Sequence, residues 1–136
     1  MKRYIVAMSI INPQFCKNHS IQIELEQSDE GPIPHVHVYH DHTRNPKKCS
    51  YVRLDKAEYS EHHPVVKLPR KAKREFIDCM KSSWGKQYIL SIDGDVRVAT
   101  GYEAAVNIWV DTYEDDYSKF NLDENGIPIM PDYENL

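Results

Sequence analysis

SIQIELEQ, residues 20–27, decides the fold class, because its apolar and polar side chains alternate strictly. Successive residues of a strand point to opposite faces of a sheet, so a period of two places one set against a core and the other toward solvent. The segment therefore predicts a β-strand with one buried face. Its apolar set is Ile21, Ile23 and Leu25, and its polar set is Gln22, Glu24 and Glu26.

Three neighbouring segments predict further strands. Residues 2–11, KRYIVAMSII, are rich in β-branched side chains and are expected to pair with residues 20–27. HVHVYH, residues 35–40, follows the turn-forming SDEGPIP, and CSYVRL, residues 49–54, follows HTRNPKK. The first half of the chain therefore predicts a sheet of about four strands, most simply an antiparallel meander.

Residues 68–84, LPRKAKREFIDCMKSSW, change to a helical period. Apolar side chains recur at helical spacing, while the basic side chains lie mostly elsewhere around the helix. Pro69 suits the first helical turn, where its missing N–H group costs nothing, and the helix is expected to end near Gly85.

A hairpin and a second helix are expected next. Asp93-Gly94, inside QYILSIDGDVRVATG, is the dipeptide favoured in two-residue hairpin loops. Thr100 followed by Glu103 gives the capping-box pattern that begins many helices. This favours a helix for GYEAAVNIWVDTY, although its branched residues would also suit a strand: Val106, Ile108 and Val110.

These elements predict the α+β class, with a mainly antiparallel sheet of about four to six strands and two helices packed on one face. Residues 1–114 are expected to form a single α+β domain. Residues 115–136 are acidic and rich in turn-forming residues, which predicts an irregular tail. The tail would dock if its apolar side chains found a groove: Ile127, Ile129 and Met130.

The composition is that of an ordinary globular protein. Of the 136 residues, 40% are hydrophobic and 28% are charged, unlike disordered chains. No stretch approaches the roughly 20 apolar residues of a membrane helix, and the apolar N-terminal run is expected to be a strand rather than a secretion signal. Three cysteines without a CxxC pair predict a reduced, cytoplasmic compartment and argue against a thiolate zinc site. Cys79 is expected in the core and Cys49 at the surface.

The formal net charge of -4 conceals a division along the chain. Basic residues concentrate between Arg44 and Arg74, whereas from Asp111 onward Lys119 is the single basic residue. This division predicts a dipolar molecule whose basic side can steer an anionic partner. The alternative is that the basic and acidic regions are solvent-exposed faces that bind no partner.

Residues 31–42, GPIPHVHVYHDH, place four histidines in their last eight positions. On an extended chain His35 and His37 point to one face, and the valines between and after them point to the other. Two imidazoles on one face could hold zinc or another divalent transition metal if a third ligand completed the site. The alternative is the polar side of an edge strand, with the later histidines in a loop. The candidate third ligands are His40, Asp41, His42, His62 and His63.

Other site chemistries find little support. A cupin needs a later third histidine, but none follows His63. An HNH-type nuclease would have a helix where a strand is expected after YHDHTRNP, and a two-histidine phosphoesterase needs two H-x-T or H-x-S units. The chain has no glycine-rich phosphate loop and no G-x-S-x-G nucleophile elbow.

The stretch PHVHVYH, followed by a strand and by LPRKAKREFIDCMKSSW, resembles the bacterial domain-of-unknown-function family 4160. Members of that family carry a Pro-Pro-His-Phe-His-Val-like stretch. Here Ile33 replaces the first proline, the loop HDHTRNPKK is longer, and residues 86–114 lie outside the pattern. The resemblance implies a small intracellular prokaryotic or phage protein, often encoded beside an antitoxin-like partner, and no established reaction. The positions that carry it are Pro34, His35, His37, Leu68, Pro69, Arg70, Ala72 and Trp84.

Two functions follow as hypotheses. The first is a binding module whose basic face contacts an acidic protein or RNA, with tyrosines as stacking surfaces if they share one side. The second is a metal-dependent hydrolase or nuclease that uses His35 and His37 as ligands. The basic face would consist of Arg53, Arg70, Lys71, Lys73 and Arg74, and the tyrosines are Tyr39, Tyr51 and Tyr59.

Overall fold

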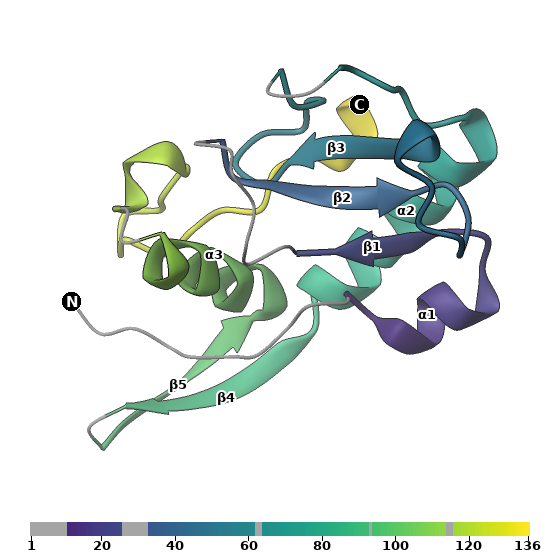
Figure 1. The fold of residues 1–136 in the computed structure, drawn as a ribbon. Helices are drawn as coiled ribbons and strands as arrows, with labels where there is room; N and C mark the ends of the chain where they lie inside the picture. Colours follow the sequence, from purple (N-terminus) through teal and green to yellow (C-terminus); the bar gives the residue numbers. More distant parts are fainter. Residues whose placement is uncertain (1–10, 26–32, 62–63, 93, 114–115) are drawn as a thin grey trace.

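The computed structural model describes residues 11–25, 33–61, 64–92, 94–113 and 116–136, and it has the expected α+β class (Figure 1). Helices and antiparallel strands share the chain, and three short 3-10 turns complete it. The elements are α1 (Pro13–Asn18), β1 (Gln22–Glu24), β2 (His35–Tyr39), η1 (Pro46–Lys48), β3 (Cys49–Arg53), α2 (Arg70–Trp84), β4 (Gln87–Ile92), β5 (Asp95–Thr100), α3 (Gly101–Thr112), η2 (Tyr117–Lys119) and η3 (Tyr133–Asn135).

The first sheet is an antiparallel meander in the order β1-β2-β3. Glu24 lies opposite His37, which lies opposite Tyr51, so these three residues form one row across the sheet. Of the strand expected over residues 2–11, residues 2–10 lie outside the described residues. At its end, the Ile11 N–H donates to the Ile23 carbonyl at 2.9 Å. Because β2 pairs with both β1 and β3, it is the central strand of this sheet, and the alternative of an edge strand is wrong.

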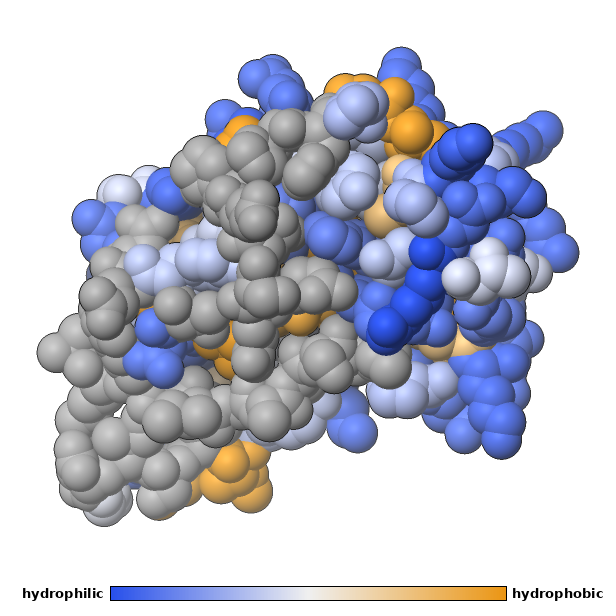
Figure 2. Space-filling view, viewed as in Figure 1, coloured by the Kyte–Doolittle hydropathy of each residue, from blue (hydrophilic) through white to orange (hydrophobic). Residues whose placement is uncertain are grey.

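The hairpin forms a sheet of its own. β4 and β5 pair in register around a tight turn in which Gly94 has a φ of 83°, as the Asp93-Gly94 pattern predicts. Within the described residues this hairpin does not pair with β1-β2-β3, so the strands divide into two sheets rather than forming one. Its outer face exposes Ile89, Val96 and Val98, and hydrophobic side chains appear at the lower rim of the molecule, where the hairpin lies (Figure 2).

A single apolar core joins the sheet to the helices. Val36 and Val38 of β2 and Val52 of β3 are fully buried, and α2 runs behind this sheet (Figure 1). The buried stripe of α2 follows the helical period predicted from the sequence. It consists of Ala72, Phe76, Ile77, Cys79, Met80 and Trp84.

α3 is buried on all sides from Gly101 to Val110. Because a helix buried all round has no polar face, its sequence shows no clear helical period and also suited a strand. The Thr100 hydroxyl accepts a hydrogen bond from the Glu103 N–H at 3.1 Å, as expected for a capping residue. The Glu103 carboxylate is nearly inaccessible and forms an ion pair with Arg97 of β5. This contact ties the helix start to the hairpin.

The tail expected over residues 115–136 contains η2 and η3 and reaches the core. Phe120 and Tyr133 belong to the buried cluster, with Tyr133 only 5% exposed. Of the three side chains expected to make the contact, Ile129 and Met130 are 51% and 37% exposed, and Ile127 is half-buried. The segment therefore docks through its aromatic residues.

None of the helices in the described parts of the chain is long and apolar enough to cross a membrane.

Candidate functional site

His35 and His37 share one face of β2, as the two-residue repeat predicts. Their rings stack with centroids 5.2 Å apart and planes inclined by 19°. Tyr51 of β3 meets the His37 ring edge to face, with centroids 4.7 Å apart, and lies 5.7 Å from His35. Tyr39 follows on the same face, 6.3 Å from His37. The face opposite the valines is therefore a cluster of imidazole and phenol rings.

The two histidines differ in burial. His35 is 0% exposed, and its Nδ1 lies 2.6 Å from the Ile33 carbonyl oxygen. His37 is half-buried. Because β2 is the central strand, His35 is a packed residue of the sheet rather than a solvent-facing one.

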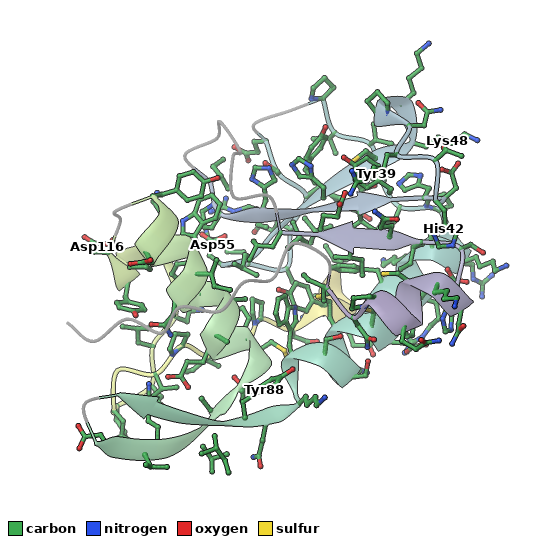
Figure 3. The ribbon with its side chains drawn as sticks, turned by 60° about the horizontal axis from the view of Figure 1, so that its bottom comes forward. Tyr39, His42, Lys48, Asp55, Tyr88 and Asp116 are labelled. Carbon is green, nitrogen blue, oxygen red and sulfur yellow. The ribbon has the colours of Figure 1, made fainter. Side chains whose placement is uncertain are left out.

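The candidate third ligands in the loop after β2 have other contacts. The His40 Nε2 lies 2.7 Å from the Ser50 hydroxyl, and burial lowers the pKa of His40. The His42 Nε2 lies 2.5 Å from the His19 carbonyl oxygen, and Asp41 accepts from the Thr43 N–H at 2.8 Å. Figure 3 shows Tyr39, His42 and Lys48 at one end of the sheet and Asp55 at the other.

Among the described residues, no three His, Cys, Asp or Glu side chains form a group that could hold a metal ion. His62 and His63, which the sequence also offers as ligands, lie outside the described residues. Within the described residues, His35 and His37 therefore offer two imidazole rings on one face of β2 as metal ligands, without a third ligand beside them.

The basic side chains predicted to form one face are only partly brought together. The Arg53 side chain is 16% exposed, and its Nε and Nη2 donate hydrogen bonds to the Asp55 carboxylate, each at 2.9 Å. This hydrogen bonding raises the pKa of Arg53, and its guanidinium also lies 3.9 Å from Glu58. Arg53 is therefore committed to local carboxylates.

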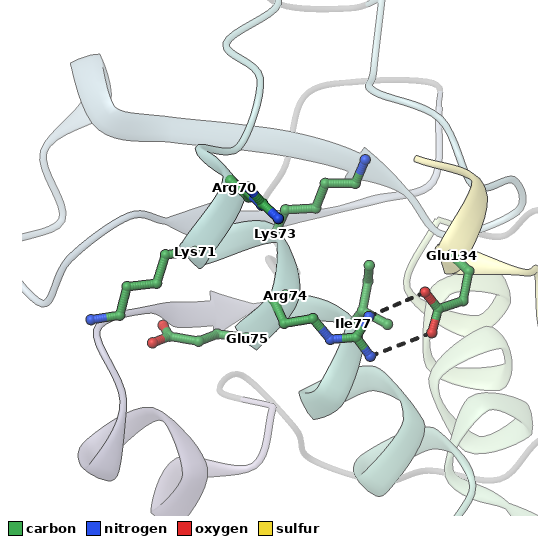
Figure 4. Close-up of a pocket in the computed structure, with 7 residues that line it drawn as sticks. All are labelled: Arg70, Lys71, Lys73, Arg74, Glu75, Ile77 and Glu134. Carbon is green, nitrogen blue, oxygen red and sulfur yellow. Dashed lines mark hydrogen bonds and ion pairs between the residues drawn. The ribbon is translucent and has the colours of Figure 1, made fainter.

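The four basic residues near the start of α2 do meet, in a groove of about 800 Å³ (Figure 4). They occupy the first turns of the helix, where the peptide dipoles leave a partial positive charge. The first turn has no acidic residue, and among the described residues no side chain caps it. The lining consists of Arg70, Lys71, Lys73, Arg74, Glu75, Ile77 and, from η3, Glu134.

Glu134 is the site residue that sequence reasoning missed. Its carboxylate accepts from Arg74 Nη1 at 3.3 Å and from Arg74 Nη2 at 3.5 Å, and it forms an ion pair with Lys81. The hydrogen bond from Lys81, assisted by Arg74, lowers the pKa of Glu134. Lys73 also donates to the main-chain oxygen of Leu136. The sequence signal for this contact was the opposite charge of the basic helix and the acidic C-terminal segment.

The three tyrosines do not share a surface. Tyr39 and Tyr51 lie on the histidine face, whereas Tyr59 is paired with Val52, which faces the core. The Tyr59 hydroxyl accepts from the Leu68 N–H at 3.3 Å. A stacking surface made of all three is therefore excluded.

All three cysteines are buried and free, so the expected surface position of Cys49 is wrong, whereas that of Cys79 in the core is confirmed. Cys16 and Cys79 interact: a hydrogen bond from the Cys79 thiol lowers the pKa of Cys16 to about 7, and the same bond and burial raise the pKa of Cys79.

Comparisons with protein-family models, with curated proteins and with solved structures found no match for this chain.

Proposed function

We propose that the protein is a binding module that contacts an anionic macromolecule, an acidic protein or RNA, through the α2 groove. The observation that carries the proposal is the gathering of Arg70, Lys71, Lys73 and Arg74 at the positive end of a 15-residue helix. Repulsion among these cations and with the helix dipole is relieved when an anion binds. An antitoxin-like acidic protein, as the family resemblance implies, would be such a partner in a bacterial or phage cytoplasm.

Charge reversal tests this function. Arg70→Glu/Lys71→Glu is compared with Lys47→Glu/Lys56→Glu, which makes the same change in net charge at exposed residues outside the groove. Fluorescence anisotropy is measured with a labelled oligoglutamate peptide and with a labelled single-stranded RNA. We expect at least about a tenfold loss of affinity in the groove variant alone, and weaker binding of the native protein as salt rises. Equal losses in the two variants would show that net charge, and not the groove, attracts the probe.

A metal-dependent hydrolase or nuclease is the second candidate, and the stacked pair of imidazoles favours it. Two nitrogen donors on one face suit a divalent transition metal, but an open catalytic site needs three protein ligands. The test is the zinc content of protein purified without a histidine tag, compared with His35→Gln/His37→Gln. Stoichiometric zinc that the double variant loses would support the metal site, whereas metal-free native protein that binds no added zinc would refute it.

A further inference from the structure

The groove on α2 already holds one carboxylate of the same chain. From η3, Glu134 forms an ion pair with Arg74, 60 positions earlier in the sequence (Figure 4). It also forms an ion pair with Lys81. Arg74 has a second carboxylate partner in Asp78, at 2.9 Å. The end of the groove nearest the middle of α2 is therefore neutralised from within the molecule.

The turn that carries Glu134 is held in place by its neighbours. Tyr133 packs against Phe76 of α2 edge to face, with ring centroids 5.5 Å apart. The Asp132 side chain accepts from the Glu134 N–H at 3.1 Å and caps the turn. A carboxylate anchored this closely acts at a high effective concentration, although its individual ion pairs are exposed.

The other end of the groove keeps its positive charge. Arg70 and Lys71 are exposed, and within the parts of the chain that the structure describes neither has an ion-pair partner. Figure 4 shows Lys71 pointing away from Glu134. An extended anion could therefore contact Arg70 and Lys71 directly, and would gain Arg74 and Lys81 by displacing Glu134.

The lining favours peptide carboxylates over RNA. The described residues that line the groove include no aromatic ring on which a base could stack, and Ile77 is their apolar member. The net charge of -4 repels a long polyanion, whereas a short acidic segment interacts mainly with the groove itself. The resident ligand is also a carboxylate held by the planar fork of an arginine.

We propose that the α2 groove binds an acidic peptide segment with at least two carboxylates, and that Glu134 is its resident competitor. The inference rests on the proposed function and names the partner class and the contact that restrains binding. A partner would have to displace the Glu134 carboxylate while Tyr133 stays buried against Phe76.

The experiment compares Glu134→Gln with Glu124→Gln. Both variants remove one negative charge from the same acidic segment, but Glu124 is exposed and does not line the groove. Labelled oligoglutamate, oligoglutamine of equal length and single-stranded RNA serve as probes at low salt. We expect the Kd for oligoglutamate to fall about three- to tenfold in Glu134→Gln and to change by less than about twofold in Glu124→Gln.

The outcomes separate this inference from the proposed function. Equal affinities of Glu134→Gln and Glu124→Gln for oligoglutamate, with binding still weakened by Arg70→Glu/Lys71→Glu, would overturn the competitor role and leave the groove as the binding surface. A gain for RNA equal to the gain for oligoglutamate would overturn the choice of a peptide partner. If charge reversal at Arg70 and Lys71 left the affinity unchanged, both the proposed function and the inference about Glu134 would be overturned.

Discussion

His35 and His37 lie two residues apart on one strand, but they have different surroundings. His35 is fully enclosed and close to the Ile33 carbonyl, whereas His37 is half-buried in ring contacts with Tyr51 and Tyr39. The period of two predicts their shared face, because it depends only on strand geometry. Their burial depends on β2 being central, which is decided by pairing with distant strands.

Separate substitutions should therefore give unequal stabilities. We expect His35→Gln to lower the free energy of unfolding by about 1–3 kcal/mol, since a buried polar group would lose its fitted contact, and His37→Gln to lower it by less than about 1 kcal/mol. Urea denaturation of the two variants measures the difference. Equal losses would mean that the two imidazoles contribute alike to the fold.

Cys16 should make stability depend on pH. Its pKa is about 7 in the folded protein, compared with an ordinary value of 9.0, because the Cys79 thiol donates to its sulfur. Between these values the unfolded chain binds one proton more than the folded one, so the free energy of unfolding rises with pH in this window. We expect a rise on the order of 1–2 kcal/mol from pH 7 to pH 9, absent in Cys16→Ala. Parallel pH profiles of the two proteins would contradict this assignment.

At the scale of elements, local sequence rules predict the features that depend on neighbouring residues. The hairpin turn at Gly94, the Thr100 cap and the apolar stripe of α2 all follow from such rules. α1 was not predicted, because six residues are too few for a helical period to show. Its signal was Asn12 before Pro13, a capping residue followed by a proline suited to a first turn.

The junction between the hairpin and α3 gives a test at this scale. A Cβ atom on Gly101 would lie 2.5 Å from the Ser83 carbonyl oxygen, so Gly101→Ala must push α3 away from the end of α2. We expect it to lower the free energy of unfolding by about 2–3 kcal/mol. Gly126→Ala is the comparison, because Gly126 has a φ of 77° but open space around it, and should cost about 1 kcal/mol. Thermal and urea denaturation of both variants would detect the difference, and equal costs would argue against tight packing at Gly101.

In the whole molecule, the basic and acidic parts of the sequence do not form two separate surfaces. The acidic end of the chain folds back onto the basic helix, where Glu134 meets Arg74 and Lys81. The division of charge predicts a dipolar molecule, but it does not predict that Glu134 reaches the groove, which depends on the packing of Tyr133 against Phe76. Packing over such a separation cannot be read from local patterns.

That long-range contact also bears on folding kinetics. Both sheets pair strands that are consecutive in the chain, so they can form by closing short loops. The docking of η3 on α2 closes a far longer loop, and we expect it to form after the rate-limiting step. Tyr133→Leu should then accelerate unfolding and leave the folding rate nearly unchanged, as stopped-flow chevron plots would show. If folding slowed in proportion to the lost stability, docking would belong to the transition state. With late docking, the last few residues determine how long the native state survives rather than how fast it forms.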